Sequence, residues 1–160
     1  MKIIFSIFLL LSFSIDPNLA EIRKAFPTAA NSETNATAFA AKLADVTNDD
    51  KTLLAYKGAS ITMVSKFKKK ISDKISTFKE GAKIIESAVS SEPNNIEIRL
   101  VRLGIQENVP GIVKYKMNIK EDAAFILKHY KDQSNVLKEY IRSFVSHSKS
   151  FSAEEKLTFK

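Results

Sequence analysis

The stretch Asn94–Ile105, NNIEIRLVRLGI, decides the fold of this chain. Its apolar residues fall on nearly every side of a helix, and the two asparagines ahead of them are good helix caps. Pro93 ends whatever helix comes before it. A helix that is apolar nearly all round lies at the centre of its domain. We therefore expect a central helix from about residue 96, with other helices packed around it.

Apolar residues at three- and four-residue spacing predict amphipathic helices on both sides of this stretch. We expect Pro27 to kink or end the first helix, and Ser76 to cap the fourth. Lys114–Met117 alternates for only four residues, which is too few for a strand. The expected fold is all-α, an array of about six to eight antiparallel helices in hairpins. The expected helices cover about 18–27, 33–46, 49–69, 76–92, 118–130, 134–147 and a short segment from 152, besides the central helix, which runs from about 96 until Pro110-Gly111 breaks it.

Composition agrees with a globular helical domain. Hydrophobic residues make up 44% and charged residues 27% of the 160 residues, as in ordinary folded proteins. Four glycines and four prolines supply little turn chemistry for an all-β fold. The chain has no cysteine, which excludes disulfides and thiolate metal sites.

The segment Met1–Ser14, MKIIFSIFLLLSFS, resembles a secretory signal peptide. Lys2 precedes an apolar run, and a small-x-small site follows at Ser14. The run is too short to span a membrane, which takes about 20 apolar residues. We expect cleavage after Ser14, with Ala20 as a second candidate, and no transmembrane segment. The mature chain, residues 15–160, would then be one helical domain that is exported to the periplasm or secreted.

The segment Lys79–Asn95 resembles the second helix and closing turn of a tetratricopeptide repeat. That family has a small residue where Gly81 stands, a bulky one at Ile85, alanine at Ala88 and proline at Pro93. Small residues let the two helices of a hairpin approach closely. The family's first helix has a large-small-large pattern, matched here by Leu54, Gly58 and Ile61.

The match departs from that family in its spacing, because about ten extra residues, roughly 66–75, separate the two helices. No 34-residue period repeats along the chain. Arrays of these repeats present a concave surface to peptides. The resemblance therefore implies a scaffold or binding module.

The mature sequence also resembles a group of short exported proteins of Bacteroidetes. The resemblance rests on three stretches: Leu53–Ser60 (LLAYKGAS), Ser91–Leu100 (SEPNNIEIRL) and Ile105–Pro110 (IQENVP). That group has no assigned activity. The resemblance implies a helical fold and export, and implies nothing about chemistry.

The usual constellations of enzymes are missing from the sequence. His129 and His147 are too far apart for a compact ligand pair, and three Ser-x-x-Lys matches lack the motifs that accompany them in penicillin-binding folds. We interpret the candidate carboxylates as solvated residues or helix caps. We therefore expect no catalytic residues, no metal site and no cofactor. The carboxylates so interpreted are Glu97, Glu107, Glu121 and Asp122.

The strongest charged feature is Lys66–Lys70, KFKKK, extended by Lys74. Lysines stabilise a helix C-terminus and keep a connection solvated. The alternative is contact with an anionic surface, such as phospholipid or lipopolysaccharide head groups, with Phe67 as an apolar anchor. Nucleic acid is not an expected partner of an exported protein. The candidate contacts are Lys66, Phe67, Lys68, Lys69, Lys70 and Lys74.

A second candidate surface is Asn108–Lys120, NVPGIVKYKMNIK. It is either a connection folded over the core or a partner-binding edge that includes Tyr115. Arg99 and Arg102 lie one turn apart on the central helix. They must pair with a carboxylate or emerge at the edge of that helix. We take Arg99, Arg102 and Tyr115 as candidate partner contacts.

Together these features favour a non-enzymatic, exported helical scaffold or binding module that contacts a protein or a component of the cell envelope. The alternative is a protein that binds an anionic envelope surface or a small ligand through Lys66–Lys74. The sequence leaves the oligomeric state open.

Overall fold

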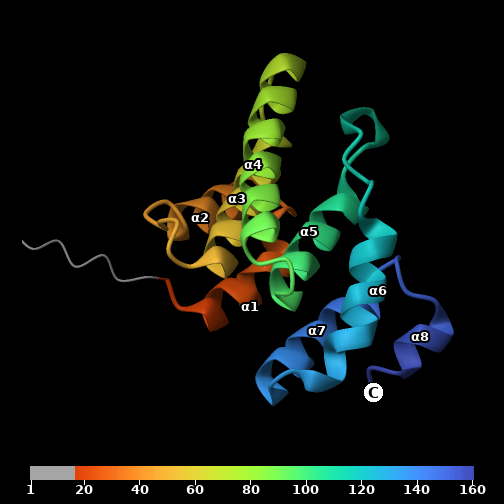
Figure 1. The fold of residues 1–160 in the computed structure, drawn as a ribbon. Helices are drawn as coiled ribbons and strands as arrows, with labels where there is room; N and C mark the ends of the chain where they lie inside the picture. The colour runs from red at the N-terminus through yellow and green to blue at the C-terminus, as the bar shows by residue number, and fades with distance from the viewer. Residues whose placement is uncertain (1–16) are drawn as a thin grey trace, which may run out of the picture.

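The computed structural model describes residues 17–160, which form eight α-helices and, within that range, no strand (Figure 1). The helices pack as antiparallel neighbours, so the expected all-α fold is confirmed. The predicted signal peptide, residues 1–14, lies outside the described residues.

Four helices form the first half: α1 (Leu19–Ala29), α2 (Glu33–Lys42), α3 (Lys51–Ser65) and α4 (Ile71–Ser91). The side chains of Asn18, Ser32 and Asp50 cap the first three by accepting bonds from backbone N–H groups of the first turn. Pro27 lies inside α1, which ends two residues later.

The start of α4 differs from the expectation. The helix begins at Ile71 and continues through Ser76, so the prediction that Ser76 caps it was wrong. Asp73 in the first turn of α4 favours this earlier start, because a negative charge is stabilised at a helix N-terminus. Most of the extra segment between the two hairpin helices is therefore helix or turn.

The second half holds α5 (Ile96–Asn108), α6 (Ile119–His129), α7 (Asn135–His147) and the short α8 (Ala153–Leu157). Single 3-10 turns precede α6 at Gly111–Val113 and follow it at Tyr130–Asp132. The Asn95 side chain caps α5, and a capping box between Ser152 and Glu155 starts α8.

Helix α5 lies at the centre, as its sequence predicts. Every residue from Ile96 to Gln106 is buried. One of its faces, with Ile98, Val101 and Ile105, belongs to a core shared with α1–α4. The opposite face, with Ile96, Leu100 and Leu103, belongs to a second core shared with α6, α7 and the two phenylalanines on either side of α8, Phe151 and Phe159.

Helices α3 and α4 meet backbone against backbone at two glycines. A Cβ atom placed on Gly58 would lie within 3 Å of the carbonyl oxygen of Gly81, and one on Gly81 within 3 Å of the carbonyl oxygen of Gly58. This confirms that small residues at these positions allow a close helix approach. The wider resemblance to tetratricopeptide repeats stays a prediction.

Candidate functional site

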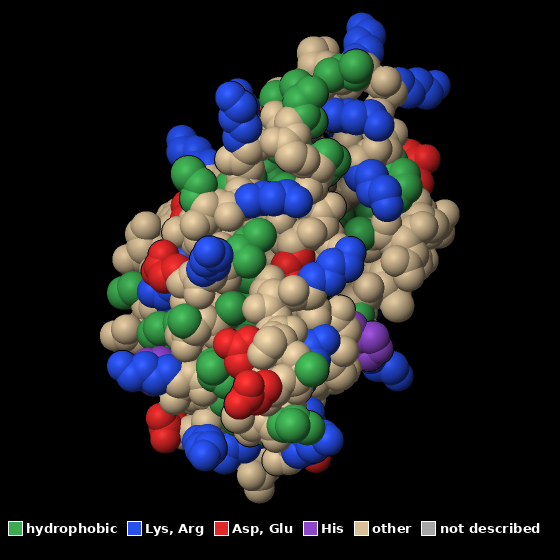
Figure 2. Space-filling model, turned by 90° about the vertical axis from the view of Figure 1, so that its right-hand side faces the viewer, with side chains coloured by type: hydrophobic (Ala, Val, Ile, Leu, Met, Phe, Trp, Pro, Cys, Tyr) green, Lys and Arg blue, Asp and Glu red, His purple; other side chains and the backbone are tan. Residues whose placement is uncertain are grey.

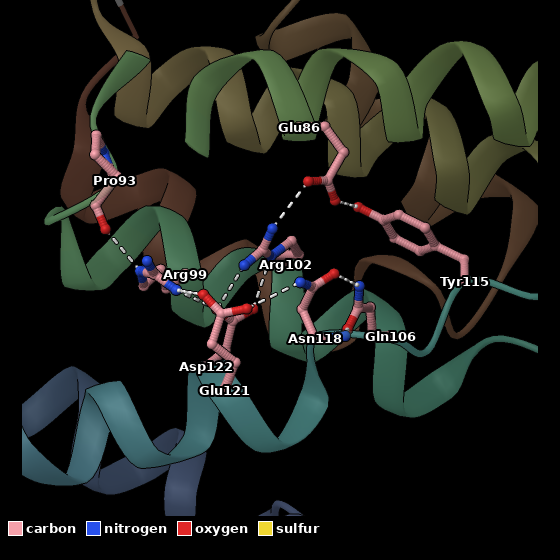
Figure 3. A network of polar contacts seen from close by, with 9 residues as sticks. All are labelled: Glu86, Pro93, Arg99, Arg102, Gln106, Tyr115, Asn118, Glu121 and Asp122. Atoms are coloured by element: carbon pink, nitrogen blue, oxygen red, sulfur yellow. Dashed lines mark hydrogen bonds and ion pairs between the residues drawn. The ribbon is translucent and has the colours of Figure 1, made fainter. Parts of the chain in front are cut away.

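Asp122 on α6 is the centre of a buried ion network (Figure 3). Arg102 of α5 binds it with two atoms, Nε to Oδ2 at 2.7 Å and Nη2 to Oδ1 at 2.7 Å. Arg99 adds a third bond, from Nη1 to Oδ1 at 2.9 Å. Burial alone would lower the pKa of Arg102, but its bonds to Asp122 and Glu86 outweigh burial and raise that pKa. Arg102 therefore stays charged inside the fold.

The network continues outward to the connection between α5 and α6. The guanidinium of Arg102 also donates to Glu86 on α4 at 2.8 Å, and the Tyr115 hydroxyl donates to the other oxygen of Glu86 at 2.6 Å. The ring of Tyr115 packs edge-on against Phe78, with 5.5 Å between centroids. Burial, and then the bond to Glu86, raise the pKa of the Tyr115 hydroxyl. These contacts fix the connection against α4.

A further set of bonds fixes the start of α6 to α5. Gln106 donates to the Asn118 side chain at 3.3 Å and accepts from the Asn118 backbone N–H at 3.2 Å. The Asn118 amide donates to Glu121 at 3.0 Å, and Arg99 donates to Glu121 at 2.8 Å. Asn118 is the N-cap residue of α6, but its side chain forms no capping bond to the backbone and bonds instead to the Glu121 side chain.

The structure brings the three candidate partner contacts Arg99, Arg102 and Tyr115 together in this network. Both arginines are buried against carboxylates, which decides between the two alternatives left open for them. The interpretation of Asp122 as a solvated or capping residue was wrong, because its side chain is 0% exposed. Asp122 lies four residues before the buried Ile126, and that spacing could have placed it on the core face of α6.

A second buried carboxylate, Glu97 on α5, was also wrongly interpreted as solvated or capping. Arg23 of α1 binds its two oxygens at 2.8 and 2.5 Å, and the Tyr56 hydroxyl of α3 donates to it at 2.9 Å. The Tyr56 and Tyr140 hydroxyls lie 2.9 Å apart, which connects α3 to α7. Burial raises the pKa of Tyr56 well above its usual value.

The positive charge of the chain gathers at one end, which we call the basic end and define as residues 66–83 and 110–120. These segments carry ten lysines and two carboxylates, a net charge of +8, whereas the whole chain carries +7. The start of α4 and the tip of the α5–α6 connection project from the same end of the molecule (Figure 1). Figure 2 shows the molecule turned by 90°, with lysine or arginine side chains interspersed with apolar side chains over the upper part of the visible face.

The six residues of the predicted lysine contact divide into two groups. Lys66 donates to the Ala30 carbonyl at 3.0 Å, Lys74 donates to the Lys66 carbonyl at 2.9 Å, and Phe67 packs against the first core. These three support the fold around the connection. Lys68, Lys69 and Lys70 are exposed.

The apolar side chains exposed at the basic end do not include Phe67, the predicted apolar anchor. Phe67 is half-buried, whereas Ile71 is 71%, Ile112 79% and Met117 84% exposed. Ile112 and Met117 lie in the second candidate surface, Asn108–Lys120, but no periodicity there separates exposed from packed apolar side chains. Ile71 is the first residue of α4, whose start was placed later in the sequence.

Among residues 17–160, no group of three or more histidine, aspartate or glutamate side chains is placed to hold a metal ion. No helix in the described part is both long enough and apolar enough to cross a membrane. Comparisons with protein-family models, curated proteins and solved structures found no match for the chain. The resemblance to exported Bacteroidetes proteins stays a prediction.

Proposed function

We propose that this protein is a non-enzymatic helical binding module that contacts an anionic partner through its basic end. The observation that carries the proposal is the uneven charge: residues 66–83 and 110–120 hold a net +8, so the rest of the chain is close to neutral. Charge needed only for solubility would be spread over the surface. A local excess of one sign attracts and orients a partner of the opposite sign.

The contacts beneath the basic end support a binding role. Glu86 and Phe78 fix Tyr115 to α4, and Lys74 ties the first turn of α4 back to Lys66. Residues 66–83 and 110–120 are therefore anchored to α4 and need little ordering when a partner binds. A preorganised surface is what a binding module requires.

The arrangement of the buried carboxylates supports a non-enzymatic role. Glu97 and Asp122 are the acids most shielded from water, where carboxylates are best suited to acid–base chemistry. Each is held by arginine guanidinium groups and serves to join helices. Their geometry fits a structural role.

We include export in the proposal because of the layout of Met1–Ser14. The partner would then be a protein or a component of the cell envelope. The intact mass of the protein recovered from outside the cytoplasm tests this point. A chain that begins at Ile15 or Glu21 supports export with cleavage, and an exported chain that retains Met1–Ser14 contradicts cleavage.

Photo-crosslinking in the native cells tests the contact itself. A photoreactive residue is placed at Lys69 or Met117 in the basic end, and at Lys131 or Val136 as exposed controls near α7. We expect crosslinked products from the two basic-end positions and none from the controls. Products from the control positions alone, or from no position, would contradict the proposal.

A further inference from the structure

We infer that the anionic partner is the head-group surface of a lipid bilayer rich in acidic phospholipid, with Ile71, Ile112 and Met117 entering among the head groups. This inference rests on the proposed function and names the class of its partner. It follows from which apolar side chains are exposed, and from where the lysines stand around them.

The exposed apolar side chains are concentrated in the basic end. Among the described residues, the large apolar side chains open to solvent are Ile71, Ile112, Met117, Val136 and Leu157, and the first three are the most exposed. All three lie within residues 66–83 and 110–120. Exposing such side chains to water is unfavourable, and a lipid interface removes that cost.

The lysines stand beside these apolar residues. Lys70 directly precedes Ile71, and Lys116 directly precedes Met117. A long lysine side chain can place its ammonium group among lipid phosphates while its methylene groups lie along apolar surface. Exposed lysines next to exposed apolar side chains are typical of surfaces that bind the membrane interface.

The two segments are held in a fixed relation, so they can reach one plane together. Tyr115 lies between Ile112 and Met117 in the sequence, and its hydroxyl donates to Glu86 of α4 (Figure 3). Its ring packs against Phe78 of the same helix. Ile71 stands at the start of that same helix. A polyanion in solution would engage the lysines but would leave the three apolar side chains in water, so a bilayer fits the surface better.

Sedimentation with vesicles tests the electrostatic part. The full chain is mixed with vesicles of phosphatidylcholine alone or with phosphatidylglycerol added, at low and high salt. We expect binding at least about tenfold stronger to the anionic vesicles, weakened by salt. Replacing three exposed lysines together, Lys68→Gln, Lys69→Gln and Lys70→Gln, should remove most of that preference. A matched variant with Lys24→Gln, Lys128→Gln and Lys131→Gln should keep it.

Every variant carries residues 1–14, so the differences between variants report on the basic end alone. Circular dichroism of each variant establishes that it is folded. Equal binding to neutral and anionic vesicles, or equal loss in the two lysine variants, would overturn the inference.

Insertion is tested with a single cysteine, since the chain has none of its own. An environment-sensitive dye is attached to Met117→Cys or, as a control, to Val136→Cys. We expect anionic vesicles to shift the emission of the dye at position 117 to the blue and to leave the dye at position 136 unchanged. An unshifted dye at position 117 would overturn the inference.

The vesicle results and the crosslinking results separate the two proposals. Basic-end crosslinks to a protein, combined with no vesicle binding, would overturn the lipid inference and leave the proposed function standing. Binding to a soluble anionic polymer such as heparin, without binding to anionic vesicles, would also overturn the lipid inference and leave the proposed function standing. Failure of both the crosslinks and the vesicle binding would overturn both.

Discussion

Two neighbouring helix pairs in this fold are joined by opposite means. Helices α3 and α4 meet where side chains are absent, at Gly58 and Gly81. Helices α5 and α6 meet through charged side chains, with Arg99 and Arg102 on one helix and Asp122 on the other. The first contact depends on close packing, and the second on matched charge in a buried site.

The two contacts are sensitive to different substitutions. A glycine contact leaves no room for one extra methyl group, because the nearest neighbouring atom at each glycine is a backbone carbonyl oxygen that cannot rotate away. A buried ion network tolerates small changes of shape but fails when one charge is removed and its partner is left uncompensated.

Asp122→Asn should have the largest effect. The substitution keeps the shape of the side chain and removes the only fully buried charge that faces Arg99 and Arg102 among the described residues. We expect a loss of about 3–5 kcal/mol in the free energy of unfolding, because two guanidinium groups lose their central partner. Chemical denaturation measures it. A loss no greater than that of Glu121→Gln would show that the network contributes little.

Gly81→Ala should destabilise the other pair by about 1–3 kcal/mol, because the new methyl group forces the two backbones apart. Within a helix, alanine is otherwise more favourable than glycine by roughly 0.5–1 kcal/mol, so any net loss reports the close contact. Gly111→Ala is the matched control, because a Cβ atom there meets nothing within 4 Å. A variant at Gly81 as stable as the parent would contradict the backbone contact.

Tyr115→Phe should lower the free energy of unfolding by about 1 kcal/mol, the usual contribution of one hydrogen bond. It tests the bond that joins the ion network to the connection between α5 and α6. The pKa of the Tyr115 hydroxyl is raised above its usual value of 10.0. The protonated form is thus favoured in the fold, and its contribution is complete below pH 10 and is lost as pH rises further. Denaturation at neutral pH and above pH 10 should show the difference between the two proteins shrinking. A difference in the free energy of unfolding that stays constant with pH would contradict the raised pKa of Tyr115.

Glu121→Gln should have the smallest effect, about 0.5 kcal/mol or less, because Glu121 is exposed and water screens its pair with Arg99. The bond from Arg99, and then that from Asn118, hold the pKa of the Glu121 carboxyl below its usual 4.5. Its contribution is therefore present above that pH and is lost on acidification. A carboxyl titration followed by NMR measures the shift, and an unshifted carboxyl would contradict the bond.

The same contrast explains what could be predicted from the sequence. Gly58 and Gly81 sit at helical spacing beside apolar residues, and this local pattern indicates a close approach. Asp122 and Arg102 are 20 residues apart, and their pairing depends on how α6 lies on α5. The charge at Lys66–Lys70 is visible in the sequence. Residues 110–120 join it through long-range contacts, such as those of Tyr115 with Glu86 and Phe78, which no local pattern predicts.

The start of α4 was missed for a different reason. Its N-cap residue is Lys70, which forms no side-chain cap in the described structure, so the usual signal of a helix start is missing there. Ser76 looked like a better cap because its residue type prefers that position. Asp73 in the first turn, rather than a side-chain cap, favours the observed start.

The two apolar faces of α5 have a consequence for native-state dynamics. Because each core uses one face of this helix, neither core can open without uncovering part of α5. We expect its backbone amides to be the slowest in the chain to exchange with deuterium, and to exchange only through global unfolding. Amides in the α5–α6 connection, which lies at the surface, should exchange through small local openings long before them.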